Sequence, residues 1–343
     1  MLSRIEFDLP GGLETSSCRK TAFFLVSLPH FDSFPPDSNF RIQLPTSVPS
    51  SLFGGDSGRP QKISQESKAT MWRSILITGM FVVVCGTGGG LSFAQEFRIR
   101  TTIYQHQQEA DPMIVSRSVS IFHAEKVYDH VDGLGEVTIF DPIQKKLILL
   151  NESRMIKTVI NFDEIKHLLN VARHQTQEYI HDQIKREETK GKAIAGRLKF
   201  QLDPSFETQF DSKKNQLMLE SKLINYRVQC VAPDQQASVE NYLRFADWMA
   251  RLNYVLHPYT LPPASRIALN EELRTRNLIP IEVDLQTHLD EKLHLRAEHK
   301  IHWKLDHKDR GLIHHWETLR KNKEVNTITI QEYLRNQFAT LRK

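Results

Sequence analysis

The chain has 343 residues, and its 45 lysines and arginines against 41 acidic residues give a formal net charge of +4. No basic tract and no basic face with interleaved aromatic residues occurs, which disfavours a nucleic-acid-binding protein. Of three cysteines only Cys230 lies beyond residue 94, which excludes a disulfide within residues 95–343.

The first 94 residues contain an internal export signal. Residues 1–70 are rich in Ser, Pro and Phe without a sustained period, which predicts a disordered extension or a mis-assigned start. Residues 71–94 have a basic start at Arg73, an apolar run over 75–85 and a small-residue end, which is typical of a secretory signal peptide. We therefore expect an exported mature domain, residues 95–343, in the periplasm or outside the cell.

The apolar run of the signal is too short to remain as a membrane anchor. It has 11 residues, whereas a transmembrane helix needs about 20. We therefore expect no transmembrane span in the mature chain. After the 8 basic and 7 acidic residues of the first 94 are removed, the charges of the mature chain nearly balance.

Alternating apolar and polar residues predict a series of strands in the first half of the mature chain. The expected strands cover 97–103, 115–121, 137–140, 146–150 and 155–162. Asp141 and Pro142 lie in the loop between the third and fourth of these strands, so the two should form an antiparallel hairpin. Short links between successive strands predict an antiparallel meander, because parallel pairs need long crossover connections.

The apolar period then changes to 3.6, which predicts helices with two strands between them. The expected elements are a helix over 163–185, strands over 217–220 and 223–231, and helices over 239–257 and 265–277. Asp163 and Ser265 are the side chains expected to cap the first and the third helix.

The C-terminal part combines the clearest hairpin with two helices. Strict alternation over 281–289 and 293–305 predicts two long antiparallel strands, each with one apolar and one polar face. Such strands belong to a sheet that is buried on one face. Two helices are expected within 308–342, and Thr329 with Glu332 forms a capping box for the last one.

Histidine is frequent, so a metal site has to be considered. His167, His174 and His181 recur every seven residues on the first helix, with Glu178 between the last two. They lie opposite the apolar stripe of that helix, where a metal would lack supporting hydrogen-bond partners, so a solvated polar face is the expected role. The patterns HExxH, CxxC and paired Cys/His spacing are absent, and we expect no metal and no cofactor.

His299 is expected to point to the apolar face of the last long strand. It is either a ligand or catalytic group in a pocket, or a core histidine bonded to a neighbour. Together with Ile301 and Trp303, which share its face of the strand, it is the candidate ligand-binding set. No catalytic residue is assigned, because GxSxG is absent and Cys230 is expected to be a buried, inert thiol.

The order of elements and three local segments resemble the LolA-like envelope proteins. The segments 135–141, 146–151 and 154–162 give a hairpin with a short polar turn, followed by a strand that leads into a helix. LolA-like proteins are exported half-barrels whose concave face, plugged by helices, holds acyl chains or an apolar ligand. The helix motif in 242–253 and the segment 261–263 are also similar to those of uncharacterised exported bacterial proteins.

These patterns and the resemblance predict an α+β protein with a strongly curved, half-barrel-like antiparallel sheet, helices on its concave face and a helical C-terminus. The resemblance implies non-catalytic binding of an apolar ligand or lipid by the curved sheet. The alternatives are an envelope scaffold or protein-interaction module without a small ligand, and an enzyme with a pocket around His299. An open apolar cavity would favour ligand binding, a closed core with an exposed apolar patch would favour a protein partner, and polar groups converging on His299 would favour catalysis.

Overall fold

The computed structural model describes most of the expected mature domain. The described ranges are 96–107, 110–185, 189–233, 235–257, 260–289 and 292–341. The expected extension, residues 1–70, and the expected signal peptide, residues 71–94, lie outside the described residues. The domain boundaries at these positions therefore stay predictions.

Within the described residues, twelve strands form one sheet that is not closed into a barrel. They are β1 (Phe97–Gln107), β2 (Ala110–His123), β3 (Lys126–Val131), β4 (Glu136–Asp141), β5 (Lys146–Asn151), β6 (Ile156–Asn161), β7 (Glu207–Asp211), β8 (Gln216–Glu220), β9 (Ile224–Val231), β10 (Ile279–His288), β11 (Lys292–His302) and β12 (Asn326–Thr327). Their order across the sheet is β12-β6-β5-β4-β3-β2-β1-β11-β10-β9-β8-β7. Neighbouring strands are antiparallel except for β12 and β6, which are parallel.

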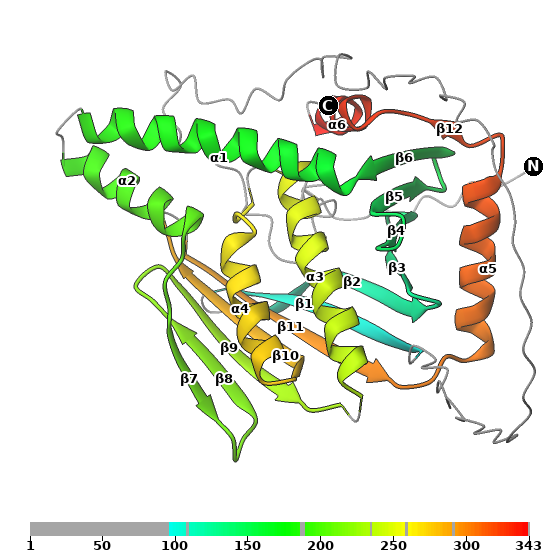
Figure 1. Ribbon diagram of the computed structural model, residues 1–343, viewed down its shortest axis with the longest axis horizontal. Coiled ribbons are helices and arrows are strands. Elements are labelled where there is room, and N and C mark those ends of the chain that lie inside the picture. The colour runs from blue at the N-terminus through cyan, green and yellow to red at the C-terminus, as the bar shows by residue number, and fades with distance from the viewer. Residues whose placement is uncertain are drawn as a thin grey trace, which may run out of the picture. The chain divides into compact units, whose positions relative to one another are not determined.

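Six helices accompany the sheet in the described part of the chain. They are α1 (Phe162–Lys185), α2 (Thr189–Leu202), α3 (Gln236–Leu256), α4 (Ala264–Thr275), α5 (His307–Lys321) and α6 (Ile330–Leu341). Figure 1 shows α3 and α4 side by side across the strands β9, β10 and β11, and α1 and α2 as a pair of adjacent helices. These helices bury apolar faces against the same side of the sheet.

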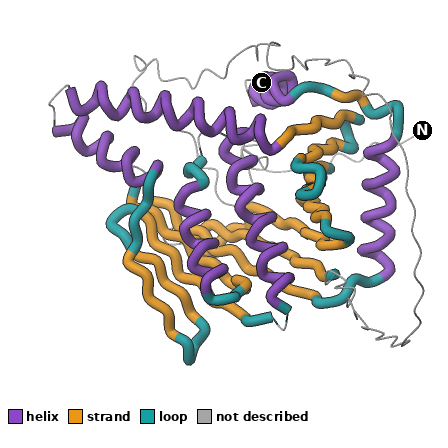
Figure 2. Tube along the Cα trace, in the orientation of Figure 1, coloured by secondary structure: helices purple, strands orange, loops and turns teal. Residues whose placement is uncertain are grey.

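The sheet has two faces with different covers, which we call the inner face and the outer face. Phe122 and Phe140 point to the inner face, where they pack against α3. Their chain neighbours Ile121 and Ile139 point to the outer face and pack with Trp316 of α5. Figure 2 accordingly shows α5 on the other side of β3–β6 from α3. Strands covered on both faces have near-continuous apolar runs instead of strict alternation.

The predicted α+β class is confirmed, as are the antiparallel sheet and the helical C-terminus. The expected hairpins are β4 with β5 and β10 with β11. The sequence did not predict β3, β7, β12 or α2. The strand β3 is buried on both faces and lacks alternation, β7 is mostly polar, and α2 contains Gly191 and Gly196. The strong curvature of the sheet stays a prediction.

Two of the three expected caps are wrong. α1 begins at Phe162, so Asp163 lies inside its first turn, where a negative charge still favours the helix N-terminus. α4 has Pro263 at its N-cap, and Ser265 lies within the helix instead. For the last helix, the Glu332 N–H donates to Thr329 Oγ1 at 3.2 Å, which confirms the cap there.

Candidate functional site

The inner face carries a polar cluster around His299. His299 in β11 lies directly opposite Thr101 in β1, and Thr101 Oγ1 and His299 Nδ1 are 2.9 Å apart. Only 7% of His299 is exposed, and its Nε2 has no hydrogen-bond partner among the described residues. Burial, with a smaller effect of the charge on Arg266, lowers the pKa of His299 to about 3. The imidazole is therefore neutral at physiological pH.

Arg266 is the charged member of this cluster, and it comes from the first turn of α4. Its exposed fraction is 6%, and its Nη2 donates to Tyr242 Oη at 3.3 Å. The ring of Tyr242 meets that of His299 edge-on, with 6.5 Å between ring centroids. Beside them, Tyr226 Oη donates to Ser265 Oγ at 3.4 Å. β1, β9, β11, α3 and α4 thus bring hydroxyl, imidazole and guanidinium groups together.

An ion pair joins α4, the helix that carries Arg266, to α3. Asp247 in α3 accepts a hydrogen bond from Arg274 Nη2 at 2.9 Å, and such charge-assisted bonds are the strong ones. Arg266 precedes Leu269 and Leu273 by three and seven residues, so all three lie on the stripe of α4 that faces the core. That spacing was the signal that could have identified Arg266 from the sequence. Tyr226 and Tyr242 occupy buried positions of β9 and α3 and have no such signal in the sequence.

Two other predicted ligand-binding residues lie further along β11. Ile301 is half-buried and packs against the inner apolar core. Trp303 follows the end of β11, is 36% exposed, and has its ring centroid 5.6 Å from that of Phe97. The structure therefore groups His299 with Ile301 on the inner face and places Trp303 at the end of the sheet. Contact of the three with a ligand stays a prediction.

The other residues considered in the sequence are the three histidines of α1 and Cys230. His167, His174 and His181 are exposed on α1. Within the ranges that the structure describes, no three His, Cys, Asp or Glu side chains are arranged to hold a metal ion. Cys230 is buried, and burial raises the pKa of its thiol to about 12, which leaves the thiol protonated and unreactive.

A second buried polar group crosses the inner face on β2, β3, β4 and β6. Ser120 Oγ donates to Asp129 Oδ1 at 2.6 Å, and Asp129 is 0% exposed. Asp129 Oδ2 and the hydroxyls of Thr138 and Thr158 have no hydrogen-bond partner in the described part of the chain. Burial raises the pKa of Asp129 to about 7, against the lowering effect of the Ser120 bond.

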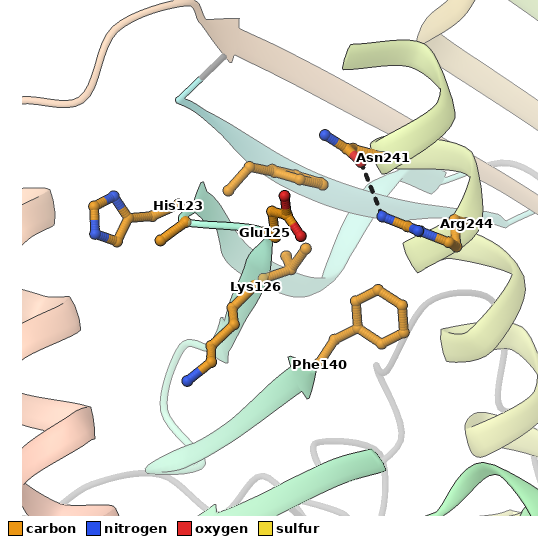
Figure 3. Close-up of a pocket in the computed structure, with 9 residues that line it drawn as sticks. His123, Glu125, Lys126, Phe140, Asn241 and Arg244 are labelled. Carbon is orange, nitrogen blue, oxygen red and sulfur yellow. Dashed lines mark hydrogen bonds between the residues drawn. The ribbon is translucent and has the colours of Figure 1, made fainter. Parts of the chain in front are cut away.

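Two hollows among the described residues differ greatly in size. Figure 3 shows the smaller one, beside the turn between β2 and β3, with Lys126 and Phe140 on one side and Arg244 on the other. Its volume of about 10 Å³ is room for about one water molecule. The larger hollow, a groove between α1 and α2, has a volume of about 420 Å³. It is lined by Gln177, Ile180, Lys199, Phe200, Leu202 and Asp203.

The sequence matches no known family model and no curated protein sequence. No helix in the described ranges is both long enough and apolar enough to cross a membrane. The function therefore has to be inferred from the geometry of the groove and of the polar cluster.

Proposed function

We propose that the protein is a non-catalytic binding protein of the cell envelope that holds an apolar ligand, or the apolar chain of a lipid. The observation that supports this proposal is the groove between α1 and α2. Ile180, Phe200 and Leu202 give it an apolar lining from both helices. Its volume of about 420 Å³ lies within the range of about 300–1,000 Å³ of small-molecule sites. Burial of an apolar chain there contributes about 25 cal/mol per Å².

The groove lies between two contacts that fix the separation of the helices. At one end, Gly191 of α2 approaches α1 so closely that a Cβ atom there would lie 2.6 Å from the Gln183 carbonyl oxygen. At the other end, Arg173 Nη2 and Asp203 Oδ2 form an ion pair at 2.8 Å. A groove framed in this way is largely pre-formed, which lowers the entropic cost of binding.

The inner face of the sheet offers less room for a ligand. Phe245, Met249 and Leu252 of α3 are each 0% exposed, so they fill the space over the sheet as a packed core. A ligand that bound against the sheet would have to displace such side chains. We therefore place the apolar ligand between the two helices and not on the strands.

Binding is proposed in preference to catalysis because His299, the candidate acid–base group, is too deeply buried to contact a substrate. A general acid or base works best with a pKa near the operating pH and must contact the reacting atoms. His299 is 7% exposed, and its pKa is lowered to about 3. The polar groups that converge on it are therefore read as a binding or structural cluster.

A pair of variants tests the groove. Leu202→Trp should fill it, whereas Ile184→Trp adds the same ring to a site on α1 that is already 38% exposed. Radiolabelled hexadecanol, a neutral apolar chain, should bind the unchanged protein and Ile184→Trp equally well. Leu202→Trp should bind it at least about tenfold more weakly. Equal binding by both variants, or no binding by the unchanged protein, would contradict the proposal.

Export is the second half of the proposal, and it rests on residues 71–94. Intact-mass measurement of the protein isolated from its own cells should give a chain that begins at Gln95. Native mass spectrometry of the same sample should reveal a co-purifying lipid. An intact chain that begins at Met1 in the cytosol would contradict this half.

The interaction-module alternative is favoured by one feature of the outer face. Arg100 and Lys300 are exposed and directly opposite each other on β1 and β11, and like charges in such pairs are destabilising. An acidic protein partner would relieve this repulsion. Titration with poly-glutamate tests the idea: it should bind in a salt-dependent way, and Lys300→Glu should weaken the binding while Lys222→Glu does not.

A further inference from the structure

Arg266 is a buried arginine that has no carboxylate partner among the described residues. It is the only arginine or lysine among the buried residues that the structure describes. Arg98 and Arg274, which are more exposed, each pair with two or more carboxylates. Arg266 has a single hydrogen bond, to Tyr242 Oη, and its Nε has no acceptor among the described side chains and backbone.

The groups around Arg266 do not neutralise its charge. Burial raises the pKa of both Tyr226 and Tyr242, so these phenols stay protonated. The thiol of Cys230 stays protonated too, because its pKa is raised to about 12. His299 is neutral and leaves its Nε2 without a partner. Buried arginines are almost always paired, so this position calls for an anion that is not part of the described chain.

We propose that Arg266 binds the carboxylate head group of the ligand whose apolar chain occupies the groove between α1 and α2. The inference rests on the proposed function and names the ligand class: a long-chain carboxylic acid. The single positive charge of the buried Arg266 guanidinium, surrounded by neutral groups, would be balanced by the single negative charge of one carboxylate. The planar guanidinium also presents paired N–H groups that fit the two oxygens of a carboxylate.

The surroundings of Arg266 add further donors for such a head group. The first turn of α4 has no side-chain cap, because Pro263 occupies the N-cap position. Its free N–H groups and the positive end of the helix dipole therefore favour an anion beside Arg266. The Tyr242 hydroxyl, which accepts a hydrogen bond from Arg266, can donate its own proton to the second carboxylate oxygen.

A row of aromatic rings connects this cluster to the groove. The ring centroid of Tyr226 lies 6.1 Å from that of Phe206, and Phe206 lies 5.6 Å from Phe200. Phe200 in turn lines the groove between α1 and α2. An apolar chain that runs from Arg266 to the groove would therefore contact aromatic side chains along its length.

The test compares hexadecanoate with hexadecanol, which have the same chain and differ in charge. The unchanged full chain should bind hexadecanoate about 10- to 100-fold more tightly, because hydrogen bonds to a charged group contribute that much. Arg266→Met should abolish this preference by weakening the binding of hexadecanoate. Arg251→Met is the matched control on α3, where the guanidinium lies over the Trp248 ring, and it should keep the preference.

The outcomes separate this inference from the proposed function. If the unchanged protein binds neither compound, the proposed function fails. If it binds both compounds equally well, or if Arg266→Met keeps the preference, Arg266 does not bind the head group. The proposal that the groove binds an apolar chain is then unaffected.

A measurement on the unchanged protein does not depend on the folding of any variant. Hexadecanoate labelled with ¹³C at its carboxyl carbon should stay ionised in the complex at a pH where the same acid in water is protonated, because Arg266 favours the charged form. A bound carboxyl group that titrates as it does in water would overturn the assignment.

Discussion

Arg98 of β1 and Asp309 of α5 form an ion pair in which one guanidinium nitrogen, Nη1, lies 2.7 Å from both carboxylate oxygens. The exposed fractions of the two side chains are 13% and 3%. Asp309 also accepts the backbone N–H of Asp306 at 2.9 Å as part of a capping box. The pair therefore connects the start of α5 to the sheet and fixes the helix over the outer face.

Loss of Arg98 should destabilise the fold. Arg98→Met leaves the buried Asp309 carboxylate without a cation, and the expected loss in free energy of unfolding is about 3 kcal/mol. Arg310→Met is the control, because Arg310 is 54% exposed and forms a surface pair with Glu96 that is worth less than about 1 kcal/mol. Urea denaturation measures both values. A similar small loss in the two variants would show that the Arg98 pair does not hold α5.

Asp129 should make the stability of the protein fall as pH rises. Its pKa is about 7 in the folded protein, against an ordinary value of 3.8. Between pH 3.8 and about pH 7, the Asp129 carboxyl is ionised in the unfolded chain but still protonated in the folded protein. The free energy of unfolding therefore falls by up to about 1.4 kcal/mol per pH unit across this window.

Asp129→Asn should remove this pH dependence. Relative to the unchanged protein, the variant should gain about 4 kcal/mol in free energy of unfolding between pH 4 and pH 8. Urea denaturation across this range gives the difference curve. Asp182→Asn, at an exposed carboxylate, is the control. A flat curve for Asp129→Asn would show that Asp129 is ionised in the folded state.

His299 should have the opposite effect on the acid side. Its pKa of about 3 lies below the ordinary value of 6.5, so between these values the unfolded chain binds a proton that the folded chain excludes. The stability should therefore fall as pH decreases through this window, by up to about 1.4 kcal/mol per unit. His299→Gln should lessen that fall, whereas His302→Gln, at an exposed site, should leave it unchanged. Urea denaturation between pH 3 and pH 7 decides between the two outcomes.

Two glycines of α2 should respond in opposite directions to the same substitution. A Cβ atom on Gly191 would meet the Gln183 carbonyl oxygen at 2.6 Å, so Gly191→Ala should cost about 1–3 kcal/mol and spread α1 from α2. At Gly196 such a Cβ would have no described atom within 4 Å apart from its own helix backbone and chain neighbours, so Gly196→Ala should gain up to about 1 kcal/mol from helix propensity. Thermal denaturation of the two variants measures the difference. Equal effects would show that the helices do not meet at Gly191.

Periodicity predicted the elements that have one buried face. Buried side chains alternate with mostly half-buried ones along β11, and α3 buries one wide stripe, so both were found from the sequence. β3 has Tyr128 and Asp129 buried on opposite faces, and its pattern therefore has no period of two. The helix that covers the outer face of β3 is α5, which is distant in the sequence, so no local pattern near β3 could indicate that this face is buried.

The candidate site was predictable only in part. Alternation along β11 correctly placed His299 on the apolar side, but its partner Thr101 is 198 residues away, and only the pairing of β1 with β11 brings the two together. Arg266 lies on the same stripe as Leu269, which is a signal of burial in the sequence. The absence of a carboxylate beside it, however, depends on the tertiary arrangement of α3, α4 and β9.

The central position of β1 has a consequence for the time at which the chain can fold. β1 pairs with β11, so the first strand of the described chain waits for one of its last strands before the middle of the sheet is complete. Sheets that pair strands distant in the sequence form slowly, because the long chain segment between the strands loses conformational entropy before the pairing contacts form. The middle of the sheet therefore cannot be complete until synthesis has reached β11, Lys292–His302.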